Sequence, residues 1–185
     1  MSADAIIEAY LKDTEDGLRC RRAGTLTVNS GQLYFFGPDT EDLDGYFGGT
    51  EGSLPKGDWP VYVVMEPGED AIVRMVLVLF GKGDPVRFEW RQHGPTHLDD
   101  GGSLVAFSPE WTDWEPDVDE ALDEAGGIDL EDGPAYRPVF TVDSGDTVLV
   151  VNVQSDLFYP YEVFDADGEL LAVLVNFTDG DAPAH

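Results

Sequence analysis

Basic residues are scarce in this 185-residue sequence. Lysine occurs only at Lys12, Lys56 and Lys82, and Lys and Arg together number 10 against 38 Asp and Glu, which gives a formal net charge of -28. Nucleic-acid binding depends on clustered cations that release counterions from phosphates, and an anionic membrane surface attracts the same kind of cluster. The composition therefore argues against direct nucleic-acid or membrane binding and indicates a cationic partner or none.

Cysteine and long apolar runs are nearly missing as well. Cys20 is the one cysteine, so an intramolecular disulfide is excluded and a reducing, cytoplasmic setting is expected. The N-terminus is acidic and lacks the positive region of a signal peptide. The longest apolar run, near Met75–Phe80, is too short to span a bilayer.

Short β-branched and aromatic runs separated by Gly, Pro and Asn predict many strands, in a chain with 21 Gly and 12 Pro. Runs at 24–28 and 32–36 flank Asn29-Ser30-Gly31 and predict a hairpin. The runs at 59–66, 71–80 and 85–91 predict a three-stranded antiparallel meander, and the middle run is apolar on both faces, as in a strand at the centre of a sandwich or under a helix. Further strands are expected at 103–107, 147–153, 159–164 and 170–177, with Asp165-Ala-Asp-Gly168 as the turn between the last two.

Two short helices are expected beside these strands. Ser2–Leu11 has an amphipathic pattern, and Asp117–Ala125 has capping-box spacing, one apolar stripe and a Gly-Gly stop. The predicted fold class is therefore β-rich α+β: an antiparallel β-sandwich or bent sheet with a short N-terminal helix and an acidic helical insertion. We expect a single domain over residues 1–185, with the acidic insertion at 99–133.

Acidic residues concentrate between Arg91 and Arg137, where thirteen Asp or Glu occur and Lys and Arg are missing. A field of one sign steers a basic partner, and tryptophan is enriched at interface hot spots. A solvated acidic face with both tryptophans buried is the alternative. The expected partner-binding residues are Glu110, Trp111, Asp113, Trp114, Glu115, Asp119, Glu120, Asp123 and Glu124.

Three functional hypotheses follow from this charge. The first is a non-enzymatic interaction protein that masks the basic surface of a toxin or a nucleic-acid-binding protein, as an immunity protein does. The second is a DNA mimic that occupies the phosphate track of a DNA-binding protein. The third is a housekeeping domain of a halophilic organism with an unrecognised site, because Asp outnumbers Glu by 24 to 14 and lysine is scarce.

Motifs for metal binding or catalysis are weak. His93 and His97 precede Asp99 and Asp100, but Gly-Pro between the two histidines prevents the helix that would bring them together, so a surface loop is expected. Asp165–Glu169 resembles the opening of a calcium loop, yet its twelfth position is Asn176 instead of the required Glu, which favours a plain turn.

Cys20 has three arginines as sequence neighbours, which favour a thiolate. A nearby base is not evident in the sequence, so a small, partly buried residue is expected. Carboxylate pairs carry no specificity among 38 acids, and phosphate-loop, dinucleotide, serine-hydrolase and zinc-protease motifs are missing. No catalytic residue, cofactor or metal is therefore predicted.

Several blocks resemble the bacterial DUF4241 family. Gly24–Gly31 followed by Phe36-Gly-Pro38 is similar to the family's opening, and 54–63 is similar to its Pro-x-Gly-x-Tyr-Pro-Val step. Val86–Trp90 resembles its Arg-Trp-Glu strand, and Ser155–Phe177 resembles its closing block. The resemblance implies a β-rich fold. The family name records no function, and similar small bacterial domains lie in toxin–immunity neighbourhoods.

Overall fold

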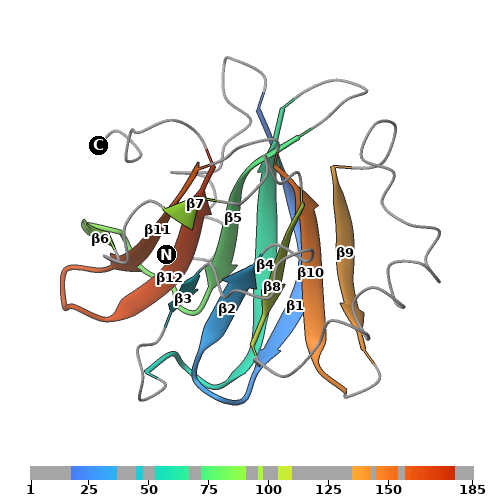
Figure 1. Cartoon of the computed structure of the whole chain (residues 1–185). Helices are drawn as coiled ribbons and strands as arrows, with labels where there is room; N and C mark the ends of the chain where they lie inside the picture. Colours follow the sequence, from blue (N-terminus) through green and yellow to red (C-terminus); the bar gives the residue numbers. More distant parts are fainter. Residues whose placement is uncertain are drawn as a thin grey trace.

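The described part of the protein consists of strands in two antiparallel sheets (Figure 1). The structure is a computed structural model, and it describes residues 18–36, 45–47, 53–66, 72–90, 96–97, 104–109, 135–142, 145–153 and 157–177. Alternating β-branched and aromatic residues, interrupted by Gly and Pro, produce this all-strand pattern.

Sheet A, the larger sheet, has the order β1-β4-β5-β12-β11-β6, and β7 also pairs with β11. Its strands are β1 (Arg19–Val28), β4 (Gly57–Met65), β5 (Val73–Leu79), β6 (Arg87–Trp90), β7 (Thr96–His97), β11 (Leu157–Phe164) and β12 (Leu170–Asn176). The late strand β12 lies between β5 and β11, so the centre of the sheet joins distant parts of the chain.

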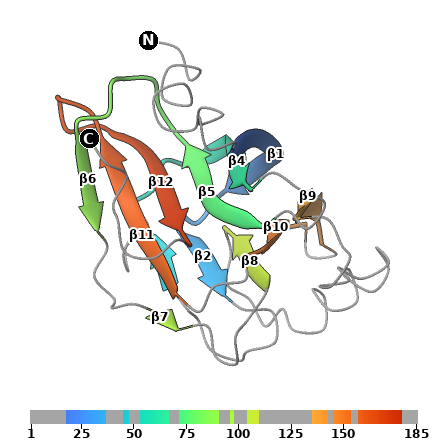
Figure 2. The same cartoon turned by 90° about the horizontal axis from the view of Figure 1, so that it is seen from above.

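Sheet B has the order β3-β2-β8-β10-β9. Its strands are β2 (Leu33–Phe36), β3 (Gly45–Phe47), β8 (Leu104–Ser108), β9 (Tyr136–Thr141) and β10 (Thr147–Asn152). Seen from above in Figure 2, β6, β11, β12 and β5 follow one curved layer, and β2 and β8 belong to the other.

The inner core lies between the two sheets. Sheet A contributes Val61, Val78 and Val175, and sheet B contributes Phe35 and Phe107, all within one buried cluster. The rings of Phe35 and Phe107 lie 6.0 Å apart, and Phe107 meets Phe177 edge to face at 6.4 Å. Aromatic contacts of this geometry add to the hydrophobic stabilisation of the shared core.

Sheet A is apolar on its outer face too. Leu77, Tyr161, Val163 and Leu174 are buried there in a second cluster, and Cys20 packs against it. β5 therefore presents Val76 and Val78 to the inner core and Leu77 to the outer cluster. This confirms the prediction that the two-faced run is a central strand.

The two sheets meet where β1 approaches β9. A bulge between Arg22 and Gly24 interrupts the β1–β4 register, and Gly24 has a φ of 147°. A Cβ at Gly24 would lie 2.7 Å from the Cβ of Val139 on β9, so only glycine fits this close approach. The backbone N–H of Thr27 also donates to Thr147 Oγ1 of β10 at 2.9 Å.

The predicted α+β class is wrong. Throughout the described ranges every regular element is a strand, and an all-β arrangement of two antiparallel sheets replaces the mixed class. The predicted helices at Ser2–Leu11 and Asp117–Ala125 both lie outside the described residues. The class is set by the β-branched and aromatic runs, which form strands throughout the described ranges.

The predicted hairpin around Asn29-Ser30-Gly31 is also wrong. Gly31 does have a positive φ of 80°, but β1 pairs with β4 in sheet A while β2 pairs with β3 and β8 in sheet B. The turn is an arch between the sheets, because Leu26 and Val28 of β1 and Leu33 and Phe35 of β2 all enter the inner core. Ser30 Oγ donates to Pro109 O at 2.6 Å and holds this arch against the end of β8.

The predicted meander is right for two of its three strands. β4 and β5 pair as expected, whereas β6 pairs with β11. The strands expected at 103–107, 147–153, 159–164 and 170–177 correspond to β8, β10, β11 and β12, and β11 and β12 form the predicted hairpin. β8 falls within the span 99–133 that was expected to be an insertion, so a central strand of sheet B belongs to that span.

Candidate functional site

The nine residues expected to bind a partner, from Glu110 to Glu124, lie outside the described residues. The strands on either side of them are described: β8 ends at Ser108, and β9 begins at Tyr136. β8 and β9 flank the same strand, β10, in sheet B. The structure therefore fixes where the acid-rich stretch leaves sheet B and where it returns.

The numbers of acidic and basic residues are nearly equal among the residues that the structure describes. Nine acidic and eight basic residues occur there, although the whole chain has 38 acids and 10 bases. The acids are Asp58, Glu66, Asp84, Glu89, Asp146, Glu162, Asp165, Asp167 and Glu169, and the bases are Arg19, Arg21, Arg22, Lys56, Arg74, Lys82, Arg87 and Arg137. The excess acid therefore belongs to sequence segments between and beyond the described strands.

The face of sheet B that points away from the inner core is apolar at its centre. Val148 and Val150 of β10 and Ala106 of β8 are each 0% exposed, and Val150 lies opposite Ala106 in the register. Leu149 and Val151, which alternate with the two valines, belong to the inner core. We call Ala106, Val148 and Val150, together with Ser108, Asn152 and Arg137, the outer face of sheet B.

Polar groups border the apolar centre of this face. Ser108 is buried at the end of β8, and Asn152 at the end of β10 is 4% exposed. Among described groups, Asn152 Oδ1 is a buried side-chain atom without a hydrogen-bond partner, which typically costs about 1–3 kcal/mol.

Arg137 provides a cation on the same face. It lies opposite Val150 in the register, and its guanidinium stacks on Phe140 with Cζ 3.9 Å from the ring centroid. Desolvation by burial lowers the pKa of Arg137 below its ordinary value, but an arginine stays protonated near neutral pH. The border of the outer face of sheet B is therefore cationic at β9.

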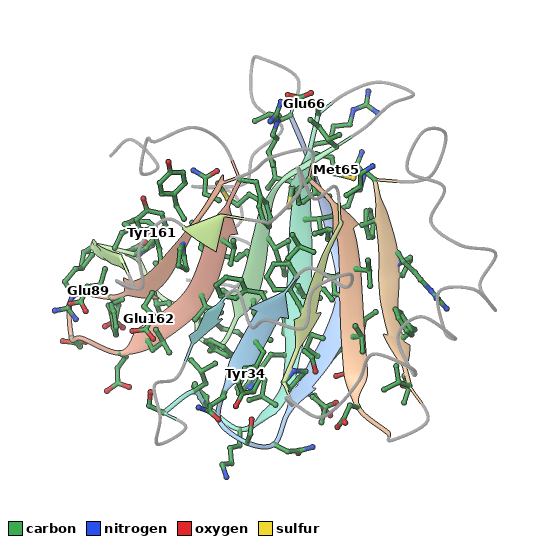
Figure 3. The ribbon with its side chains drawn as sticks, viewed as in Figure 1. Tyr34, Met65, Glu66, Glu89, Tyr161 and Glu162 are labelled. Carbon is green, nitrogen blue, oxygen red and sulfur yellow. The ribbon has the colours of Figure 1, made fainter. Side chains whose placement is uncertain are left out.

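Glu89 of β6 and Glu162 of β11 are opposite each other in the strand register, an arrangement that sequence reasoning did not identify. Glu162 is 5% exposed and lies directly opposite Glu89 in the register (Figure 3). Arg87 bonds Glu89 at 3.1 Å and stacks on Phe164 at 4.5 Å. Like charges on facing residues are destabilising, and Arg87 offsets this repulsion. Only the register identifies the pair, because Glu89 and Glu162 are far apart in sequence.

The weak motifs have mainly structural roles where they are described. Cys20 is partly buried against the outer cluster of sheet A, as expected. Asp165 Oδ1 accepts the backbone N–H groups of Asp167 and Glu169, both at 2.9 Å, which is the side-chain bonding of a tight turn.

The predicted metal candidates are only partly visible. His93, Asp99 and Asp100 lie outside the described residues, and His97 is described only as part of β7. Across the described ranges, His, Cys, Asp and Glu do not gather in threes in a way that would hold a metal ion. The same ranges contain no helix with the length and apolar character needed to cross a bilayer.

Comparison with known proteins yields no relative. The chain matches no protein-family model, no curated protein and no solved structure.

Proposed function

We propose that this chain is a non-enzymatic interaction protein whose acid-rich stretch covers a basic surface on a protein partner, in the manner of an immunity protein. The observation that carries this proposal is the uneven distribution of charge. The described strands and turns have nine acids and eight bases, whereas the stretch between Arg91 and Arg137 has thirteen acids and neither Lys nor Arg. Thirteen of the 29 acids outside the described residues lie in this one stretch.

The mechanism is electrostatic steering followed by apolar anchoring. Carboxylates of one sign raise the rate of encounter with a cationic surface by about 10- to 1,000-fold at low ionic strength. Trp111 or Trp114 then supplies the desolvated contact area that slows dissociation. The acids assigned to this role are Glu110, Asp113, Glu115, Asp119, Glu120, Asp123 and Glu124.

Binding kinetics with matched charge reversals test the proposal. The probe is a catalytically inactive basic nuclease, and the association rate is measured over ionic strengths of about 0.01–1 M, a range in which the Debye length falls from about 30 Å to 3 Å. One variant carries Asp113→Lys, Asp119→Lys and Asp123→Lys. The control carries the same charge change at three exposed acids of the described turns. Its substitutions are Asp84→Lys, Asp167→Lys and Glu169→Lys.

The two variants are expected to differ. Reversal within the acid-rich stretch reduces association at low salt by about tenfold or more and flattens the salt dependence, whereas the control retains most of the wild-type rate. Equal losses in both variants would show that only net charge matters. Binding that is indifferent to salt would reject the mechanism. Binding to DNA-binding proteins in place of the nuclease would favour the DNA-mimic hypothesis.

A further inference from the structure

Three arginines give the first half of β1 a cationic edge. This strand lies at one edge of sheet A, and Arg19, Arg21 and Arg22 near its start are all exposed. The residues opposite them on β4, within 62–65, carry no charge near neutral pH. Across the described ranges, no carboxylate bonds the guanidinium of Arg19 or Arg22, and Arg22 donates to Thr25 Oγ1 at 3.1 Å. We call Arg19, Arg21 and Arg22 the arginine edge.

The acid that follows β4 at this end of the sheet is already paired. Glu66 Oε1 accepts from Arg74 Nε at 2.7 Å, and Arg74 Nη2 bonds the same oxygen. Met65 of β4 lies between Val73 of β5 and Arg19 of β1 in the register, which places the starts of β5 and β1 at the same end of the sheet. Figure 3 shows Met65 and Glu66 at this end, with nitrogen-bearing side chains around them. Four of the eight bases that the structure describes therefore gather at one end of a protein with a formal charge of -28.

Sheet B closes the second half of the β1 edge. Thr27 N–H donates to Thr147 Oγ1 at 2.9 Å, and β9 approaches the bulge of β1. Among the described strands, only β4 pairs with β1, and the guanidinium of Arg21 donates to the Cys20 carbonyl at 2.7 Å. Charged side chains and a bulge on an edge strand oppose the addition of a further strand. The arginine edge is therefore suited to binding through its side chains and not through extension of the sheet.

We propose that the arginine edge binds an acidic, extended segment of a protein partner. Arg19 and Arg21 lie on the same side of the strand, about 7 Å apart along it, and alternate carboxylates of an extended peptide have the same spacing. Arg22 lies on the other side, so a segment that runs along the edge meets guanidiniums on both sides. Each guanidinium can bond a carboxylate through two parallel N–H groups.

Net charge favours a short acidic peptide over a nucleic acid. A nucleic acid carries a charge on every phosphate, and its binding needs many cations, whereas one of the four arginines at this end is already paired with Glu66. The acids elsewhere in the chain repel a long polyanion more than a peptide with a few carboxylates. The arginine edge shares no residue with the stretch assigned to a basic partner, and this inference does not depend on that assignment.

Fluorescence anisotropy with a defined peptide tests the proposal. The probe is a fluorescein-labelled octapeptide of alternating Glu and Thr, and the matched Gln–Thr peptide reports uncharged binding. An ionic strength of about 0.15 M shortens the Debye length to about 8 Å, which screens remote acids more than direct contacts. One variant carries Arg19→Gln and Arg22→Gln. The control removes two exposed lysines by Lys56→Gln and Lys82→Gln.

The two variants are expected to separate local charge from net charge. Loss of two exposed ion pairs should weaken binding of the Glu–Thr peptide about three- to tenfold, whereas the lysine variant should bind like wild type. Equal weakening in both variants, or equal binding of the Gln–Thr peptide, would overturn the proposal. A wild-type chain that does not bind the Glu–Thr peptide would also overturn it and leave the arginines as protection of a sheet edge.

NMR on the unsubstituted, isotope-labelled full chain keeps the test valid if the arginine variant folds poorly. The Glu–Thr peptide should shift the backbone amide signals of residues 19–22, whereas the signals of residues 87–90 in β6, at the opposite edge of sheet A, should stay in place. Equal shifts in both ranges, or none at 19–22, would contradict the proposal. An oligothymidylate that shifts residues 19–22 when the peptide does not would assign the arginine edge to nucleic acid instead.

Discussion

Gly24 is the position where one added methyl group should do the most damage. It lies at the bulge of β1, it has a φ of 147°, and a Cβ there would lie 2.7 Å from Val139 Cβ and 2.8 Å from Val139 Cγ2. Gly24→Ala therefore combines two penalties. The left-handed backbone costs an L-residue about 1–2 kcal/mol, and forcing a methyl group into a packed site costs about 1–3 kcal/mol. The expected loss of unfolding free energy is about 2–5 kcal/mol.

Gly168→Ala is the matched control. Gly168 also has a positive φ, 83°, but an added Cβ would meet nothing within 4 Å among described atoms. Its cost should be the backbone term alone, about 1–2 kcal/mol. The difference between the two variants therefore reports the contact between β1 of sheet A and β9 of sheet B together with the difference between the two backbone terms.

Urea unfolding followed by tryptophan fluorescence measures both free energies. The slope of free energy against urea should match wild type in both variants, so that midpoint shifts report stability directly. If Gly24→Ala is no more destabilising than Gly168→Ala, the close approach of β1 and β9 does not exist as described. If Gly24→Ala changes the slope, the variant has altered more than a local contact.

Three further predictions concern single groups and the response to salt. Asn152→Val removes a buried amide whose Oδ1 has no described partner, so the melting temperature should rise or stay unchanged. A loss of unfolding free energy above about 1 kcal/mol would mean that the amide makes a hydrogen bond in the folded protein. Asp165→Ala removes the acceptor of two turn hydrogen bonds and should cost about 1–3 kcal/mol in urea unfolding, whereas Asp167→Ala, which keeps that acceptor, should be nearly neutral. Thermal melting should level off once ionic strength reaches about 0.15 M, where the Debye length is about 8 Å; stability that continues to rise into molar salt would support the halophile hypothesis.

Strand positions were largely predictable because they depend on short local patterns. The runs at 147–153, 159–164 and 170–177 are short, rich in valine, leucine and aromatic residues and bounded by turn residues, and each corresponds to a strand. β9 was missed because Arg137 and Pro138 interrupt its apolar pattern, and the register irregularity opposite Val148 and Val150 shifts its alternation. Sequence periodicity has no means of anticipating such a shift.

Strand partners were less predictable because they depend on the shared core. The turn at Asn29-Ser30-Gly31 looks like a hairpin locally, yet β1 and β2 lie in different sheets because Leu26 and Phe35 enter the core from opposite sides. β6 joins β11 across a long sequence separation, which also creates the Glu89–Glu162 pair. The acid-rich stretch was found from composition alone, and composition identifies a charge without placing it in space.

The position of β12 has a consequence for biosynthesis. Residues 170–176 form the strand that joins β5 to β11, so the larger sheet cannot be completed until this late segment has left the ribosome. Before that moment, Val76, Val78 and Leu77 of β5 have an open strand edge beside them, a template for unwanted pairing with other chains. The abundance of negative charge elsewhere in the sequence would keep nascent copies apart during this interval.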